Sequence, residues 1–203
     1  MIKSIDLKKD NERNPISRIY NLYIDALQHD QKQADAASIA TYNPSQDKVS
    51  SRFVNIKYIT ENSLIFFSNY KSRKARDILL CKKVALNFFW NKLNTQIRAE
   101  GIISLCNDSF SDEHFSKRTK EKNALAISSN QSAKIKDFAE VIKNYNKVLA
   151  SSNDLNKRPA YWGGFEVRPS YIEIWSGDSN RLNRRDVYEL NDSDIWNNYI
   201  LEP

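Results

Sequence analysis

The sequence predicts a mainly β protein of the α+β class, in which one antiparallel barrel carries helices at its periphery. At least six segments have strand-like composition, and only short helical segments separate most of them. Most of the gaps are too short for the crossover helices that a parallel sheet requires. The 203 residues, 40% of them apolar and 28% charged, suit one folded domain with a sizeable core.

The N-terminal part combines a polar segment with a well-marked helix start. Residues 1–13 are polar and are predicted to be flexible, so the single domain is expected over residues 14–203. Asn14 is a suitable helix cap, and Pro15 suits the first helical position. Apolar residues then recur at helical spacing: Ile16, Ile19, Tyr20, Tyr23 and Leu27.

The middle of the chain reads as strands interrupted by one short helix. Ser72 is expected to cap this helix, which would bury Ala75, Ile78 and Leu79. A hairpin turn is expected at residues 61–63. The strands are expected over residues 38–42, 52–59, 64–68, 84–89 and 96–105.

The region after residue 108 is predicted to be helical before strands return. Residues 109–128 read as a polar helical segment, and the apolar spacing over residues 135–149 marks the most amphipathic helix of the chain. Residues 151–157 are expected to form a solvated loop. The last strands are expected over residues 161–167, 171–176, 186–190 and 195–201.

Composition argues against several classes of protein. An excess of 31 Lys and Arg over 25 Asp and Glu suggests an anionic partner: nucleic acid, acidic lipid or a small phosphate. No apolar run reaches the roughly 20 residues of a membrane span, and the N-terminus lacks the apolar core of a secretory signal. The two cysteines and two histidines have no metal-ligand spacing. We therefore expect no metal, no membrane association and a cytoplasmic location.

Glycine scarcity bears on how a phosphate would be held. With four glycines the chain has neither GxGxxG nor GxxxxGK[ST], so side chains rather than a glycine-rich loop must hold any phosphate. Arg73 and Lys74 follow Ser72 in the first helical turn, where cations oppose the helix dipole unless an anion lies between. A solvated charged turn is the alternative for this segment.

A second basic group, Arg181, Arg184 and Arg185, follows an aromatic stretch near the C-terminus. An Arg-rich surface loop and a nucleic-acid patch are both possible from this segment alone. A nucleic-acid surface would interleave exposed aromatic and basic residues, so we expect no nucleic-acid partner here. The nearby aromatic residues alternate mainly as strand-core positions: Trp162, Phe165, Tyr171 and Trp175.

Several segments together carry a family resemblance. They are SRFVNIK (51–57), IFFSNYKSRKA (65–75), NTQIRAEG (94–101), NQS (130–132), RPAYWGGFEVRPSYIEIW (158–175) and RLNRRDVY (181–188). In this order and spacing, the chain from about Asn14 onward resembles pyridoxamine/pyridoxine 5′-phosphate oxidases of vitamin B6 metabolism. The resemblance implies an FMN-binding split β-barrel that forms a homodimer with FMN at the subunit interface.

The resemblance also implies which residues hold FMN. The strand from Arg52 to Lys57 should run along the cofactor, and Gln96 should hydrogen-bond the flavin. A second group should close the site from the partner subunit: Gln131, Ser132, Trp175 and Arg185. The implied cofactor-binding residues are Arg52, Phe53, Val54, Asn55, Ile56, Lys57, Phe67, Ser68, Arg73, Lys74, Gln96, Gln131, Ser132, Trp175 and Arg185, with Arg73 and Lys74 on the FMN phosphate.

The implied substrate is pyridoxamine or pyridoxine 5′-phosphate. Arg181 and Asn183 are implied to be catalytic residues and to cover the pyridine ring. A hydride would pass from the substrate C4′ to flavin N5, and O2 would reoxidise the flavin, giving pyridoxal 5′-phosphate and hydrogen peroxide. The residues implied to bind substrate are Lys57, His114, Arg118, Lys122, Arg181 and Asn183.

Three of these positions depart from the family pattern. His114 stands where Tyr is expected, Lys122 where Ser is expected, and Asn183 where a titratable His is expected. These departures leave open a divergent split-barrel protein that binds flavin or pyridoxal phosphate but has another substrate or no turnover. The net positive charge separately leaves open a basic nucleic-acid module.

Overall fold

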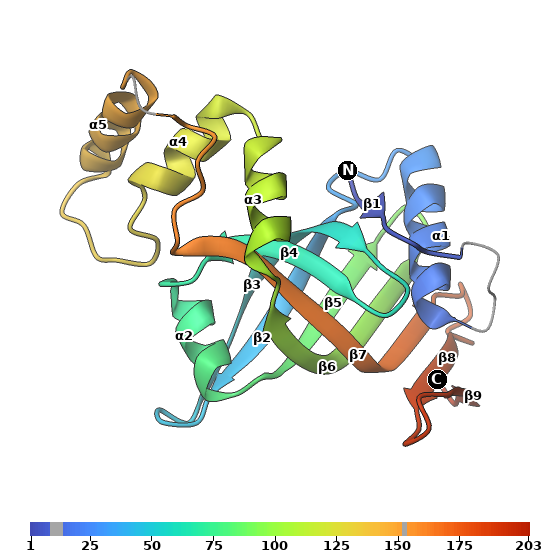
Figure 1. Ribbon diagram of the computed structural model, residues 1–203. Coiled ribbons are helices and arrows are strands. Elements are labelled where there is room, and N and C mark those ends of the chain that lie inside the picture. The colour runs from blue at the N-terminus through green and yellow to red at the C-terminus, as the bar shows by residue number, and fades with distance from the viewer. Residues whose placement is uncertain (9–13, 152–153) are drawn as a thin grey trace.

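The computed structural model describes residues 1–8, 14–151 and 154–203, and its centre is a closed antiparallel barrel (Figure 1). The strands close in the order β3-β2-β5-β6-β7-β4-β3, and every pairing around this circle is antiparallel. The predicted barrel with peripheral helices is confirmed. Its strands are β2 (Ala36–Asn43), β3 (Lys48–Ile59), β4 (Leu64–Asn69), β5 (Lys83–Trp90), β6 (Thr95–Leu105) and β7 (Trp162–Ser176).

The barrel interior is filled by alternate residues of its strands. In β5, Val84, Leu86, Phe88 and Trp90 are buried, while the residues between them are more exposed, as the period-2 pattern predicts. Phe66 and Phe165, which are paired on the adjacent strands β4 and β7, stack in the core with their ring centroids 5.1 Å apart. Burying each side chain of this size contributes roughly 1.5–3 kcal/mol to folding.

The sequence predicted two separate strands, over residues 161–167 and 171–176, where the structure has the single long strand β7. It is one strand of 15 residues, and its pairing with β6 shifts register between Glu100 and Gly101. This bulge accommodates Pro169, which cannot donate to a ladder. A Cβ on Gly101 would lie 2.1 Å from the Arg168 carbonyl oxygen, so the bulge requires glycine there.

Helix α1 (Pro15–Gln28) covers one side of the barrel beside the C-terminal strands β8 (Arg184–Leu190) and β9 (Trp196–Leu201) (Figure 1). The predicted start of α1 is confirmed, because the Asn14 Oδ1 accepts from the Ile16 N–H at 2.9 Å. Arg18 joins the helix to β8 by donating to an Asp186 carboxylate oxygen at 2.8 Å.

The N-terminus, predicted to be flexible over residues 1–13, contains a short strand. Strand β1 (Lys3–Ser4) pairs in parallel with Tyr58–Ile59 of β3. Ile2 is buried, and its N–H donates to the Tyr23 hydroxyl at 2.8 Å. This apolar side chain packs in the core next to the short strand, and residues 9–13 of the predicted flexible segment lie outside the described ranges.

The remaining helices gather near one end of the barrel, away from α1 (Figure 1). The predicted helical segment 109–128 is divided in two because Thr119 caps a new helix. None of the helices formed by the described residues has the length and apolarity that crossing a membrane demands. These helices are α2 (Arg73–Leu80), α3 (Asp108–Ser116), α4 (Lys120–Ser128) and α5 (Phe138–Leu149).

Two helix predictions were correct about the helix but wrong about burial. In α2, Ala75 and Ile78 are buried, whereas Leu79, one helical turn after Ala75, is 72% exposed. In α5, the predicted apolar face exists, but none of its residues is buried in the chain.

Candidate functional site

Two cations lie at the end of the barrel that α2 covers. The Arg52 side chain points to the same face of β3 as that of buried Val54. Its guanidinium donates to the Thr41 and Ser50 hydroxyl oxygens, each at 2.7 Å. Lys74, in the first turn of α2, is 8% exposed, and its ammonium donates to the Ser72 hydroxyl at 3.2 Å. Of the basic pair predicted in this turn, Lys74 is therefore buried, whereas Arg73 is exposed.

The charges at this end are only partly balanced by acids, because Asp77 pairs with Arg52 but not with Lys74. Burial, and then the positive charge of Arg52, lowers the pKa of Lys74 to about 8. Burial also lowers the pKa of Arg52, with a contribution from Arg73, although Asp77 lies 4.0 Å away. Within the described residues, no carboxylate forms an ion pair with Lys74. An anion bound at this helix start would offset the cost of burying these cations.

The segment after α4 lies against this cationic end within the same chain. The Arg73 N–H donates to the Ser132 hydroxyl at 3.3 Å, and the Ser68 hydroxyl donates to the Gln131 side-chain oxygen at 3.3 Å. The resemblance implied that Gln131 and Ser132 come from the partner subunit. Here the chain itself brings them to β4 and α2, because the loop after α4 folds back onto Asn69.

A gap in the barrel ladder lies beside these residues. β2 pairs with β3 from Lys48 to Asn55, whereas β4 joins β3 only from Ile56 onward. No described strand pairs with the other edge of β3 over residues 48–55, so backbone N–H and C=O groups there are available to a ligand. This gap is the split that the resemblance implied.

The strand 52–57 was predicted as a whole to contact the cofactor, but its side chains divide between two faces. Val54 and Ile56 are buried in the barrel core, so only their backbone could meet a ligand. Asn55 is exposed and Phe53 is 76% exposed. Lys57 donates to an Asp35 carboxylate oxygen at 2.6 Å, so an acid already partners this cation.

A cavity of about 220 Å³ lies next to the gap and joins residues predicted for two different roles. Phe67, Ser68 and Gln131 were implied for the cofactor, and Arg118 and Lys122 for the substrate. The complete lining is Phe67, Ser68, Asn69, Arg118, Lys122, Leu125, Ala126, Ser129, Gln131 and Trp162.

Arg118 offers an unused donor in this cavity. Its guanidinium carbon lies 4.4 Å from the centre of the Trp162 ring, and its Nη2 donates to the Lys122 carbonyl oxygen at 3.1 Å. Its Nη1 is buried without a hydrogen-bond partner among the described residues, and burial lowers the Arg118 pKa to about 10. A buried unpaired donor is costly, so an anionic acceptor fits this position.

His114 forms one wall of an aromatic group beside the cavity. Its ring stacks on Phe67, with centroids 3.7 Å apart and planes 7° apart, and its Nδ1 lies 3.0 Å from the Tyr58 hydroxyl. Burial is the first cause that lowers its pKa to about 4, followed by the charges of Arg118 and Lys57. His114 is therefore neutral near pH 7 and binds by hydrogen bonding rather than by charge.

Three expected residues and one unexpected residue form a row on the outside of the barrel, which we call the outer row. Its members are paired in register across β5, β6, β7 and β8: Phe89, Gln96, Trp175 and Arg185. The resemblance placed Gln96 on the subunit opposite to Trp175, but in this chain they are neighbours. Phe89, which is 57% exposed, was missed, and the alternation of β5 could have shown that it points outward.

The loop between β7 and β8 extends from the outer row. Arg181 is exposed and has a φ of 66°, in the left-handed region. Its N–H donates to the Asp178 carbonyl at 3.1 Å, and the Asn183 side-chain oxygen accepts from the Asp178 N–H at 3.1 Å. Both implied catalytic residues therefore belong with Trp175 rather than with the cavity.

The cavity and the outer row lie at opposite ends of β7. Trp162 lines the cavity, and Trp175 belongs to the outer row thirteen positions later. At about 3.3 Å per residue, the strand path between them is on the order of 40 Å. Within one chain, the two groups are therefore far apart along β7.

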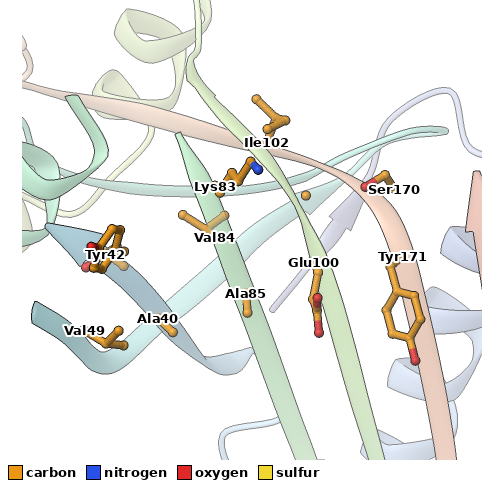
Figure 2. A pocket seen from close by; sticks show the side chains of 12 residues that line it. Ala40, Tyr42, Val49, Lys83, Val84, Ala85, Glu100, Ile102, Ser170 and Tyr171 are labelled. Carbon is orange, nitrogen blue, oxygen red and sulfur yellow. The ribbon is translucent and has the colours of Figure 1, made fainter. Parts of the chain in front are cut away.

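A shallow outer cavity of about 450 Å³ lies on the wall between these ends (Figure 2). Ala40, Ala85, Glu100 and Tyr171 follow one another across adjacent strands there, and the two alanines leave the surface hollow. None of the implied site residues lines it. It is therefore separate from the candidate ligand site.

Two protein-family models match this chain, one over its larger N-terminal part and one over its C-terminal part. A family model described as pyridoxamine 5′-phosphate oxidase matches residues 24–151. A model described as the pyridoxine 5′-phosphate oxidase C-terminal dimerisation region matches residues 162–203. The second match contains the outer row residues Trp175 and Arg185.

The curated proteins that this chain resembles include pyridoxine/pyridoxamine 5′-phosphate oxidases from several bacteria. A pyridoxine/pyridoxamine 5′-phosphate oxidase from Cytophaga hutchinsonii is 34% identical over 203 residues, covering 99% of this chain and 94% of the relative. Another from a Janthinobacterium species is 30% identical over 194 residues, covering 96% of this chain and 92% of the relative.

Solved structures support the fold. PhzG from Burkholderia lata, solved with tetrahydrophenazine-1-carboxylic acid, matches with a TM-score of 0.89 and 24% identity over 98% of this chain and all of that one. A pyridoxamine 5′-phosphate oxidase-related, FMN-binding protein from Nostoc punctiforme matches with a TM-score of 0.74 and 16% identity over 90% of this chain and 96% of that one.

Proposed function

We propose, from the premise that this chain belongs to the pyridoxamine 5′-phosphate oxidase family, that it is an FMN-dependent oxidase of pyridoxamine or pyridoxine 5′-phosphate. The observation that carries the proposal is a pair of buried or partly buried cations that have no carboxylate partner among the described residues. One is Lys74, next to Arg52, and the other is Arg118 with its unpaired Nη1. Two phosphates, one of the cofactor and one of the substrate, would match them.

FMN fits the residues at the barrel end and at the gap. Arg52, Arg73 and Lys74 would hold its phosphate through charge-assisted hydrogen bonds. The free edge of β3 and the Phe67–Ser68 segment would meet its ring system. Bound FMN would supply the hydride acceptor and pass the electrons to O2.

The substrate fits the cavity that Arg118 lines. Arg118, Lys122 and neutral His114 would bind its phosphate and fix the position of the pyridine ring. Arg181 and Asn183 would cover the ring from the partner chain. An amide side chain does not titrate, so Asn183 would orient the substrate rather than exchange a proton. Positioning dominates catalysis of this kind.

A homodimer follows from the same proposal. Because the cavity and the outer row lie at opposite ends of β7, a complete site would combine the cavity of one chain with the Gln96, Trp175 and Arg185 of its partner. The match of residues 162–203 to a dimerisation region supports this arrangement.

Anaerobic reduction of the purified, FMN-loaded protein tests the function. The flavin absorbance should bleach on addition of pyridoxamine or pyridoxine 5′-phosphate, and peroxide should form when air is admitted. Unphosphorylated pyridoxine should reduce it far more slowly, because Arg118 would lose its partner. A protein that binds no FMN would contradict the proposal.

A divergent flavin-binding protein with another substrate is the second candidate. Asn183 in place of a titratable His favours it. Bound FMN that neither phosphate ester reduces would favour this candidate, and reduction by a cyclic carboxylic acid of the kind bound to PhzG would identify its substrate class.

A further inference from the structure

We infer that Glu173 is a positioning residue for FMN, because its carboxylate holds Arg185 in place beside Trp175 in the outer row. The inference rests on the proposed function, in which Arg185 reaches the cofactor bound to the partner chain. Glu173 itself would not touch FMN.

Both carboxylate oxygens of Glu173 accept hydrogen bonds from neighbouring side chains. Its Oε1 accepts from the Arg185 Nε at 2.8 Å. Its Oε2 accepts from the Arg98 Nη1 at 3.0 Å and from the Tyr171 hydroxyl at 3.0 Å. The side chain is only 4% exposed although it lies on the outer face of β7.

Charge keeps this arrangement intact near neutral pH. The hydrogen bond from Arg185 is the first cause that lowers the pKa of Glu173, so the carboxylate stays ionised. Burial raises the pKa of Tyr171 to about 12, so its hydroxyl stays a donor. A buried carboxylate with several donors fixes the direction of each of them.

Arg185 is held on two sides and left open on a third. Its Nε is bound by Glu173, and its Nη1 donates to the Glu202 carbonyl oxygen at 3.1 Å. Within the described ranges, its Nη2 makes no hydrogen bond, so this nitrogen is free for a ligand. Trp175 lies directly beside Arg185 in register. Without Glu173, the long arginine side chain would lose this fixed direction.

The test is an FMN titration that is monitored by flavin fluorescence. It compares four proteins: wild type, Glu173→Gln, Arg185→Ala and the double variant. Glu173→Gln should weaken FMN binding about tenfold, because it removes the charge that orients Arg185. In the Arg185→Ala background, the same change should alter the dissociation constant less than twofold.

Glu100→Gln is the matched control. Glu100 also pairs with Arg98, at 2.5 Å, but it does not contact Arg185, so FMN binding should stay within twofold of wild type. If Glu173→Gln does not fold, Glu173→Asp replaces it. That variant keeps the charge but shortens the side chain, and its smaller loss of affinity should also vanish in the Arg185→Ala background.

Three results would overturn the inference. Unchanged FMN affinity in Glu173→Gln would do so, and so would an equal loss in both backgrounds, which would indicate a structural role only. Both results leave the proposed function standing, since wild type binds FMN. Wild-type protein that binds no FMN would overturn the proposed function and this inference together.

Discussion

The Arg118 guanidinium lies over the Trp162 ring, 4.4 Å from its centre, with Nη1 buried and unpaired among the described residues. The stacking fixes the plane of the cation, and burial makes its unused donor costly. A cation prepared in this way suits a phosphate that arrives with the substrate.

Arg118→Ala should raise the KM for the phosphorylated substrate by about 10- to 100-fold, because one charge-assisted hydrogen-bonded partner is lost. FMN affinity should stay near that of wild type. Steady-state peroxide release and an FMN titration measure the two effects. Arg168→Ala, which removes an exposed arginine outside the cavity, is the control and should change neither. An unchanged KM in Arg118→Ala would remove this residue from the site.

Lys74→Met should weaken FMN binding at least tenfold without lowering the Tm of the apoprotein. The loss follows from removing a phosphate contact, and the retained stability from removing a buried cation without an acidic partner. Fluorescence titration and thermal unfolding measure both. The exposed Lys143 on α5 provides the control variant, Lys143→Met. Tight FMN binding by Lys74→Met would contradict the assigned phosphate contact.

FMN affinity should fall as pH rises above about 8. The lowered pKa of Lys74 means that the free protein loses this positive charge near pH 8, while a bound phosphate favours the protonated form. Binding is therefore strongest below pH 8 and weakens from pH 8 to 10. Lys74→Arg should flatten this profile, because arginine stays charged throughout. A profile that is the same in both proteins would exclude Lys74 as its cause.

Stability should fall as the pH is lowered from 6.5 towards 4, partly because of His114. Its folded-state pKa of about 4 lies below the ordinary value of 6.5, so the unfolded chain binds more protons between these values. His114→Tyr removes this group and keeps an aromatic ring for Phe67. The Tm difference between pH 7 and pH 5 should be smaller in the variant than in wild type, and an equal difference would rule out this contribution.

Gly101→Ala should destabilise the fold by about 2–4 kcal/mol, because its Cβ would lie 2.1 Å from the Arg168 carbonyl oxygen. The backbone of β7 would have to move at the bulge. Chemical denaturation measures the loss, and Ser104→Ala on the same strand is the control. A variant as stable as wild type would show that the bulge adapts easily.

Local sequence patterns predicted the helices and strands better than they predicted which segments pack against them. The alternation of apolar residues predicted β5, and the cap at Asn14 predicted the start of α1. Both signals depend only on residues that are close in sequence. The amphipathic pattern of α5 predicted its helix but not its exposure, since burial depends on what the rest of the chain places against it.

Residue patterns alone predicted the candidate site only where its residues are close in sequence, whereas the family resemblance also named distant ones that line one cavity, such as Phe67 and Arg118. The basic pair Arg73 and Lys74 stood out by its position at a helix start. The pairing of Gln96 with Trp175, and the contact of Glu173 with Arg185, depend on strand register between distant segments. No property of the individual residues indicates such a register, so the structure was needed to find them.

The length of β7 has a consequence for mixed assemblies. If two chains share their sites as proposed, one variant damaged at Lys74 and another damaged at Arg185 would each lack activity alone. A hybrid of the two would carry one doubly damaged site and one site with both halves intact. Coexpression of two inactive chains would then restore part of the activity, a complementation that a self-contained protomer could not show.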